Sequence, residues 1–436
     1  MRASIFLCSC LLVVACETEE TPVGGPDFTI CQTKCFTGGG GDGGGGGGGA
    51  VQPRFKAIAT ARGDHDNLQV ILLGSDGYPY LLWQAHADGG WHWYGKLPNP
   101  NGVRFSTIAT GIGDDQNVQV VGIGAYDNLP YLIWQGHSDG LWFWYGPLPN
   151  PKGYQLRALA PGTYLNQQAD VGKRDLWMPA IGATDGLVYA MHLYGWGDVP
   201  SYWDGVSGFN NGSAGIYMGA ITSFTFPADY DRIPGAYVFL LGAADRMPYV
   251  TEMDYKVNGC GSPGEGVWDC WLWYYHGPLP DPGVPFSTFA AGEGSGLKPL
   301  LVGLGAKDGF PYLIFQENNG VDWNWWGALP NPSGIAFRAL ALGKGNDQNE
   351  QVILLGANDG GIPYLIWQSH SAGDFHWNGG LPNPSNLGFS SVATGNGDHD
   401  RLQVILLGAT DGLPYLIWQS DATQGNWFWY GKLPSQ

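Results

Sequence analysis

One segment of about fifty residues recurs along this chain, and this repetition constrains the fold more than any other feature. The copy that starts at Phe55 reads FKAIATARGDHDNLQVILLGSDGYPYLLWQ and ends in WHWYGKLPNP. Four further copies are clear, and two divergent ones keep the turn Gly-Ala-x-Asp and carry inserted loops. The six later copies start at Phe105, Leu156, Met218, Phe286, Phe337 and Phe389. The chain therefore contains seven copies of one unit.

Each copy is predicted to form four short strands, which in the first copy are residues 55–60, 68–74, 79–84 and 91–95. Turn residues separate them, and the second strand is apolar on both faces, which indicates a sheet covered on both sides. Such units are typical of blades stacked round an axis. The sequence therefore predicts an all-β fold: a seven-bladed β-propeller with four antiparallel strands in each blade.

The alternatives are an open solenoid and several small domains, but solenoids usually need terminal copies that differ from the rest. Here the terminal copies are among the best preserved, as a closed ring allows. The sequence leaves open whether the strand at Phe55 stays in its own blade or completes the last one.

Composition narrows the possible partners. The chain has 436 residues, 71 Gly, 30 Pro and a net charge of −18. The many Gly and Pro suit short strands with tight turns. The negative charge argues against nucleic acid and against an anionic membrane surface as partners, because both require a basic footprint. Uncharged ligands fit this charge.

The N-terminus resembles a lipoprotein signal. Arg2 precedes a short apolar stretch, residues 5–14, and Val13-Val14-Ala15-Cys16 resembles a bacterial lipobox. We expect residues 1–16 to be the signal peptide with Cys16 as the lipidation site, although an ordinary cleaved signal peptide is the alternative. Residues 17–52, with their glycine run, are expected to be a disordered tether, and residues 53–436 to be the propeller.

Four other cysteines remain in the exported protein: Cys31, Cys35, Cys260 and Cys270. An oxidising compartment favours disulfides, and Cys31–Cys35 with Cys260–Cys270 is the simplest of three pairings. A metal site is the rival interpretation, but no histidines cluster near either pair. We therefore expect no metal and no cofactor.

The third strand, PYLIWQ, is the most uniform segment of the repeat. Trp134, Trp367 and Trp418 are expected to pack between blades. Gln135 and its equivalents are expected to be buried amides that bond a neighbouring backbone, with a role as sugar ligands as the alternative.

The outer strand carries three or four large aromatic residues in several copies, such as WHWY and WFWY. Sugar rings stack their C–H faces on Trp or Tyr, while their hydroxyl groups need a few polar partners. Packing between blades is the alternative role of these aromatics. Polar residues follow the third-strand glutamine by two positions: His86, His137, His370 and Asp421.

No motif of a known enzyme class is present in the sequence. A glycosidase would need a matched pair of carboxylates, and only the divergent copies offer unrepeated ones. These carboxylates are Asp175, Glu252, Asp254, Glu265 and Asp269.

The Asp-rich turn at residues 63–67 could suggest calcium, but it degrades in the fifth copy, and short polar side chains in a turn account for it.

The segments LQVILLG, PYLIWQ, WxWYG and LPNP recur in register over residues 55–436, and in this the chain resembles the seven-bladed propeller lectins of the Photorhabdus PLL type. The resemblance is weaker over the third and fourth copies. It implies binding of fucose or O-methylated sugars at sites between blades, on copies one, two, six and seven above all. Copy six lacks the tyrosine and copy five reads WNWW, so weaker binding is expected at both, and copies three and four are expected to be silent. The carbohydrate-binding residues implied are Trp93, Tyr94, His86, Trp144, Tyr145, His137, Trp377, His370, Trp429, Tyr430 and Asp421.

The expected function is that of a multivalent lectin and not of an enzyme, exported and lipid-anchored at the outer membrane or cell surface. Its expected partners are cell-surface glycans, with the membrane contacted only through the lipid. An oligomer is compatible with the sequence. A glycan-processing enzyme with its site in copies three and four, or a protein–protein scaffold, is the alternative.

Overall fold

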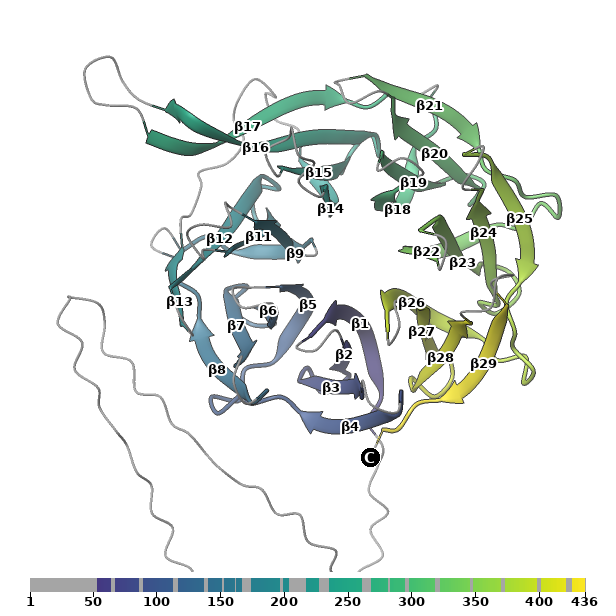
Figure 1. The fold of residues 1–436 in the computed structure, drawn as a ribbon, viewed down its shortest axis with the longest axis horizontal. Coiled ribbons are helices and arrows are strands. Elements are labelled where there is room, and N and C mark those ends of the chain that lie inside the picture. Colours follow the sequence, from purple (N-terminus) through teal and green to yellow (C-terminus); the bar gives the residue numbers. More distant parts are fainter. Residues whose placement is uncertain are drawn as a thin grey trace, which may run out of the picture. The chain divides into compact units, whose positions relative to one another are not determined.

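Seven sheets stand round a common axis in the computed structural model, each with its first strand nearest the axis and its last strand at the rim (Figure 1). The structure describes residues 53–435 with gaps. The gaps are 64–66, 86–88, 113–116, 137–139, 151–152, 161, 167–173, 197–198, 204–216, 227–234, 261–267, 281–282, 295–297, 318–321, 346–347, 370–372, 398–400 and 421–425. The expected signal peptide and tether, residues 1–52, lie outside the described part.

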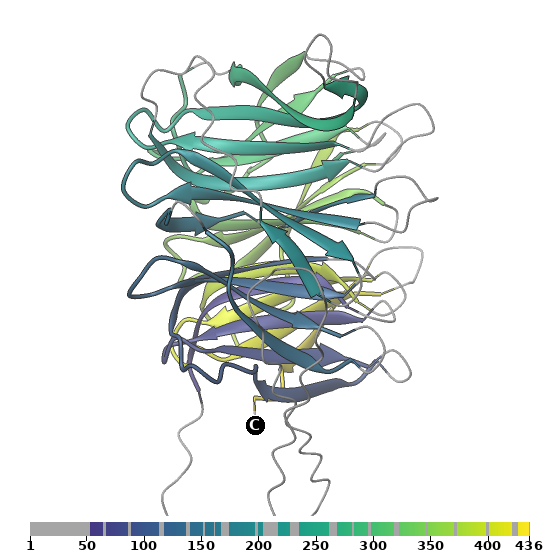
Figure 2. The ribbon, with the colours of Figure 1, turned by 90° about the vertical axis from the view of Figure 1, so that its left-hand side faces the viewer.

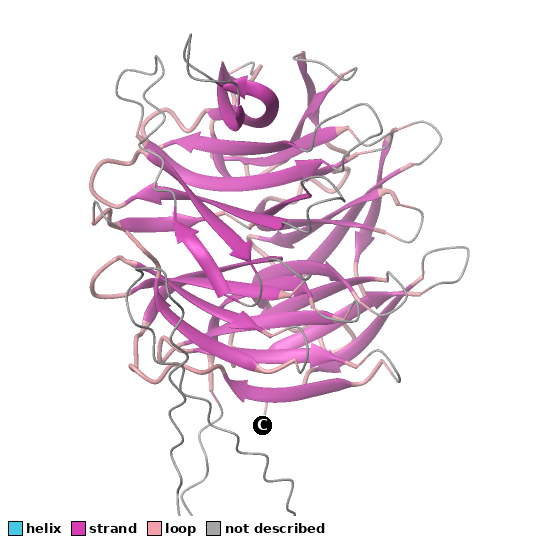
Figure 3. Cartoon of the chain, turned by 60° about the vertical axis from the view of Figure 1, so that its left-hand side comes forward, coloured by secondary structure: helices cyan, strands magenta, loops and turns pink. Residues whose placement is uncertain are grey.

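The first blade contains β1 (Phe55–Arg62), β2 (Leu68–Gly74), β3 (Pro79–Gln84) and β4 (Trp91–Lys96), paired antiparallel in that order. Side view and colouring by secondary structure show the same arrangement of strands throughout the described chain (Figures 2 and 3). No helix in the described residues is long and apolar enough to cross a membrane. The predicted seven-bladed all-β propeller is confirmed.

The inner and second strands of the later blades repeat this pattern. The inner strands are β5 (Phe105–Ile112), β9 (Leu156–Leu159) with β10 (Thr163–Asn166), β14 (Met218–Phe226), β18 (Phe286–Glu293), β22 (Phe337–Lys344) and β26 (Phe389–Asn396). The second strands are β6 (Val118–Gly124), β11 (Arg174–Gly182), β15 (Gly235–Gly242), β19 (Pro299–Gly305), β23 (Glu350–Gly356) and β27 (Leu402–Gly408). In the third blade both β9 and β10 pair with β11, so its inner strand is in two pieces.

The third and outer strands complete the blades. The third strands are β7 (Pro130–Gln135), β12 (Val188–Trp196), β16 (Pro248–Cys260), β20 (Pro311–Gln316), β24 (Pro363–Gln368) and β28 (Pro414–Gln419). The outer strands are β8 (Trp142–Pro147), β13 (Val199–Trp203), β17 (Trp268–Pro278), β21 (Trp323–Ala328), β25 (Phe375–Gly380) and β29 (Trp427–Lys432). In the fourth blade β16 and β17 run past the circumference of the ring (Figure 1).

The core lies between blades, because the second strands are buried on both faces. Val70 and Leu72 face the last blade and pack with Ile405, whereas Ile71 packs with Val120 of the second blade. Alternate side chains of one strand therefore belong to two different clusters. Each sheet shelters one face of each neighbour, which is why the repeat cannot stand alone.

One backbone hydrogen bond recurs at every junction between blades. The first N–H of each inner strand donates to the carbonyl oxygen of a turn residue in the preceding blade, and that residue has a positive φ. The pairs are Phe105–Gly77, Leu156–Asn128, Met218–Gly186, Phe286–Arg246, Phe337–Gly309, Phe389–Gly361 and Phe55–Gly412. The last pair closes the ring. Because β1 pairs with β2, the strand at Phe55 stays in its own blade.

Candidate binding site

Six of the outer strands contain a β-bulge at the same place. Leu81 pairs with Gly95 and Leu82 pairs with Trp93, which leaves Tyr94 as the extra residue of the outer strand. A bulge redirects the side chain that it carries. The extra residues are Tyr94, Tyr145, His276, Trp326, Asn378 and Tyr430. Tyr94, Trp326 and Tyr430 expose about half of their surface, at 46%, 48% and 50%.

A glycine follows each of these bulge residues. Gly95 has a φ of +102°, and the glycines at the same place in the other five strands lie between +90° and +107°. L-residues with side chains rarely adopt this region, so the glycine permits the bulge. A Cβ on Gly95 would lie at an ordinary contact distance, 3.7 Å from Nε1 of the Trp93 indole, so the backbone conformation and not crowding requires glycine here.

The four tryptophans expected to stack on sugar are half-buried in the blades. Trp93 stacks on Tyr80 with ring centroids 5.7 Å apart and lies 6.1 Å from the ring of Phe55. Trp144, Trp377 and Trp429 stack on the equivalent tyrosines at 5.8, 5.6 and 5.9 Å. One face of each indole therefore packs on a tyrosine of its own blade. A sugar could contact only the part of the indole that is exposed to solvent. Their role in binding stays a prediction.

Aromatic side chains from two blades meet at the rim. Trp83 stacks on His92 at 4.6 Å and belongs to the same cluster as Trp142 and Trp144 of the next blade. The equivalent third-strand aromatic belongs to one cluster with the first and third residues of the next outer strand at three other junctions. These sets are Trp418 with Trp91 and Trp93, Phe315 with Phe375 and Trp377, and Trp367 with Trp427 and Trp429. We call these four sets the rim clusters. The prediction that Trp367 and Trp418 pack between blades is confirmed. Trp134 stacks on Phe143 of its own blade with ring centroids 4.8 Å apart, and its packing between blades stays a prediction.

The tyrosine beneath each of these indoles is fixed by an aspartate. The hydroxyl of Tyr131 donates to Asp127 over 2.5 Å, and the backbone N–H of Leu129 donates to the same carboxylate. Burial, then the hydrogen bond to Asp127 and its charge, raise the pKa of Tyr131 to about 12. All seven blades have this pair, including Tyr189 with Asp185 and Tyr249 with Asp245 in the divergent ones. The hydrogen bond to the aspartate therefore fixes the tyrosine ring on which the outer-strand indole stacks.

The third-strand glutamines have a structural role. Gln135 is 6% exposed, accepts a hydrogen bond from Nε2 of Gln69 in the preceding blade over 2.9 Å, and donates to the Gly140 carbonyl. Nε2 of Gln403 donates in the same way to Gln84 across the closing junction, over 2.8 Å. The expected burial and the bond to a neighbouring backbone carbonyl are confirmed, and a glutamine side chain of the preceding blade is an additional partner.

Several predicted site residues lie outside the described residues. These are His86, His137, His370, Asp421, Cys16, Cys31 and Cys35. In β16 and β17 the backbone register places Cys270 opposite Lys256 and Cys260 opposite Trp268. The polar ligands, the lipidation and the disulfides stay predictions.

Two kinds of residue at the rim were missed from the sequence. The first is the second residue of the outer strand, such as His92 and Phe428, which stacks on the third-strand aromatic. The second is the bulge residue of the divergent copies, above all His276. Aligning the outer strands on their shared glycine places these residues at equivalent positions of the repeat, but it does not reveal the bulge or the stacking.

No protein-family model matches the sequence, and no curated protein matches it. Solved structures do match. The BP39L lectin from Burkholderia pseudomallei superposes with a TM-score of 0.64 and 18% identity, covering 88% of this chain and all (100%) of that one. A PL25 ulvan lyase superposes with a TM-score of 0.55 and 12% identity, covering 84% of this chain and 94% of that one. At these identities the likeness concerns the fold, which a lectin and a lyase share.

Proposed function

We propose that this chain is a multivalent carbohydrate-binding lectin of the Photorhabdus PLL type, specific for fucose or O-methylated sugars, and not an enzyme. The rim clusters are the observation that supports it. At four junctions, the half-buried aromatic ring at the third position of one outer strand lies in one cluster with a half-buried aromatic ring of the preceding blade, and each ring leaves part of its surface exposed. An aromatic surface that is open to solvent suits the C–H face of a sugar.

Repetition of the site increases the strength of binding to a surface that carries many glycans. A single shallow sugar site typically binds with a dissociation constant between about 1 mM and about 1 µM. Several sites on one rigid ring can raise binding to a glycan-coated surface by a factor on the order of a hundred or more. The name of the BP39L lectin, which shares the fold, is in keeping with this function.

We further propose that the lectin is displayed on the outer membrane or cell surface through a lipid on Cys16. The apolar stretch, the lipobox-like residues 13–16 and the glycine run support this placement. Any oligomer that the chain forms must leave the rim sites open to glycans.

A glycan array tests the proposal, with residues 17–436 produced without lipidation. We expect binding to fucosylated or O-methylated glycans that increases with glycan density and is removed by excess free sugar. A scaffold would keep its protein partner in excess sugar, and an enzyme would turn over the glycan. Binding to none of these glycans would refute the lectin proposal.

A further inference from the structure

The fourth blade has a carboxylate–imidazole pair where other blades have aromatic side chains. Glu252 in β16 occupies the third-strand position of Trp83, and His276 is the bulge residue of β17, at the position of Tyr94. Nε2 of His276 lies 2.8 Å from Oε2 of Glu252. The two side chains expose 21% and 23% of their surface, so a ligand in solution can reach them.

The pair lies on the face of the fourth blade that is turned to the fifth. Glu252 is the register partner of Tyr237, and Val250, two residues before it, packs in the cluster that joins the two blades. The Tyr237 ring lies edge-on to the Trp323 ring with centroids 5.4 Å apart. The carboxylate therefore stands on the side of the sheet that faces the outer-strand indoles of the fifth blade.

The tyrosine between the carboxylate and the indoles is fixed. Nε2 of Gln316, a residue of the fifth blade that is 3% exposed, donates to the Tyr237 hydroxyl over 2.8 Å. The Tyr237 ring also contacts the ring of Phe239. Trp323 and Trp325 are half-buried and belong to the same cluster. The fifth blade thus contributes indoles to this junction, whereas the fourth blade contributes the fixed Tyr237 and the ionisable pair.

A carboxylate beside indoles can bind a sugar through hydrogen bonds as well as stacking, whereas the aromatic rings of the rim clusters offer a surface for stacking. A carboxylate can accept hydrogen bonds from two adjacent hydroxyl groups, and bonds to an ionised acceptor are roughly twice as strong as neutral ones. An imidazole that donates to Glu252 fixes the direction of the carboxylate. The indoles offer the apolar surface on which the C–H face of the same ring can stack.

We propose that the junction between the fourth and fifth blades is a second class of sugar site, which binds two adjacent hydroxyl groups of a pyranose on Glu252 while His276 positions the carboxylate. This inference rests on the proposed lectin function. It assigns a ligand site to a blade in which Glu252 replaces the third-strand aromatic and His276 replaces the bulge tyrosine of the first blade. Among the residues that the structure describes, this carboxylate–imidazole pair occurs once.

Histidine NMR on residues 17–436 tests the site locally, with methyl α-L-fucoside and methyl β-D-galactoside as probes. Replacing His276 by Gln assigns its ring signals among the nine histidines. We expect at least one probe to shift the His276 signals in a saturable way. Glu252→Gln keeps the shape but removes the charge, and should weaken this response about tenfold or more.

Calorimetry with the same probes separates the possible outcomes. Glu293→Gln on the inner strand is the matched control and should leave the total binding unchanged. Glu252→Trp restores the aromatic residue of the first blade and checks that the junction still folds. If calorimetry shows sugar binding while the His276 signals do not respond to either probe, this inference is wrong and the lectin proposal stands. If no sugar binds to the unmodified chain by calorimetry or on the array, both are wrong.

Discussion

The backbone N–H of Phe55 donates a hydrogen bond to the carbonyl oxygen of Gly412 over 2.9 Å, and this joins the first blade to the last. The same bond joins Phe105 to Gly77 over 2.7 Å, between two blades that are consecutive in the chain. The glutamine contact also crosses both kinds of junction. The closing junction is therefore built like the others, without a strand exchanged between blades.

A circular permutant should consequently fold. We expect a chain that begins at Val103, ends at Gly102 and joins Ser435 to Pro53 through a short linker to keep the ring, because no blade is divided. Its circular dichroism and melting temperature should be close to those of residues 53–435, apart from a small cost of the new ends. A permutant cut inside a blade, between β2 and β3, is the control and should be less stable. Equal loss of structure in both permutants would show that the junctions are not equivalent.

The tyrosine–aspartate pairs predict how the protein responds to alkali. The pKa of Tyr131 is raised to about 12, so the folded state favours the neutral phenol. An unfolded tyrosine loses its proton near its ordinary value of 10.0, and stability is therefore lost as the pH rises from about 10 through about 12. We expect absorbance of tyrosinate at high pH to show a group of tyrosines that ionise only as the protein unfolds.

A substitution isolates one of these pairs. Tyr131→Phe removes the hydroxyl bonded to Asp127 and should cost about 1–3 kcal/mol of stability at neutral pH. It should also reduce the number of late-ionising tyrosines by one. Tyr126→Phe is the control, because that side chain is 83% exposed. If both variants titrate and unfold alike, the pair does not control the alkaline transition.

Stability and sugar binding should separate between Trp93 and Tyr94. Trp93 packs on Tyr80 and Phe55, so Trp93→Ala should destabilise the ring by up to about 3 kcal/mol and also weaken binding. Tyr94 is the bulge residue and is 46% exposed, so Tyr94→Ala should weaken binding while the melting temperature stays close to that of the unmodified chain. Thermal unfolding and the glycan array measure the two effects. A loss of stability without any loss of binding in either variant would assign these residues to packing alone.

The repeated blades could be predicted from the sequence because seven copies reinforce one pattern. The second and third strands of the first blade, β2 and β3, have the predicted bounds. The bulge at Tyr94 could not be foreseen, since it depends on the φ of Gly95 and on a one-residue offset between strands. The inter-blade partner of Gln135, which is Gln69, depends on which faces of two blades meet. No pattern within one copy contains that information.

The fourth blade could not be predicted in detail, because its inserted residues do not follow the repeat. Its β16 extends over 13 residues, although the third strand of the repeat has 6. Inserted residues have no second copy against which to compare them. The contact between His276 and Glu252 depends on the bulge that sets the register of β17, and the sequence does not contain that register.

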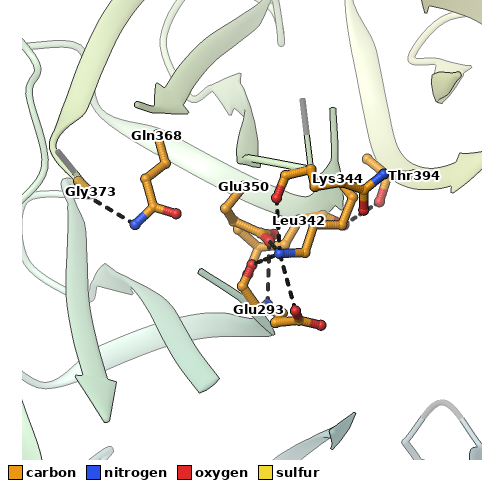
Figure 4. Close-up of polar contacts among 8 residues, drawn as sticks. Glu293, Leu342, Lys344, Glu350, Gln368, Gly373 and Thr394 are labelled. Atoms are coloured by element: carbon orange, nitrogen blue, oxygen red, sulfur yellow. Dashed lines mark hydrogen bonds and ion pairs between the residues drawn. The ribbon is translucent and has the colours of Figure 1, made fainter. Parts of the chain in front are cut away.

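Glu350 lies at the start of β23, where the first and last blades have Leu68 and Leu402. It is 1% exposed, accepts a hydrogen bond from the backbone N–H of Glu293 over 3.3 Å and lies 3.9 Å from Nζ of Lys344 (Figure 4). Lys344 also lies 3.7 Å from the Glu293 carboxylate and donates to the Glu293 carbonyl. Burial raises the pKa of Glu350 to about 8, against an ordinary value of 4.5, although Lys344 acts in the opposite direction.

This raised pKa predicts that stability falls as the pH rises. Between about pH 4.5 and about pH 8 the folded state holds the proton that the unfolded state has lost, so each step upward favours unfolding. The loss across this window should be on the order of a few kcal/mol. Glu350→Gln removes the titration and keeps the shape, so its melting temperature should depend less on pH than that of the unmodified chain. Glu317→Gln, at an exposed carboxylate, is the control and should keep the original dependence. Because Lys344 retains Glu293 as a partner, the variant should still fold, and an unchanged pH dependence in Glu350→Gln would show that the buried carboxyl does not take up the proton.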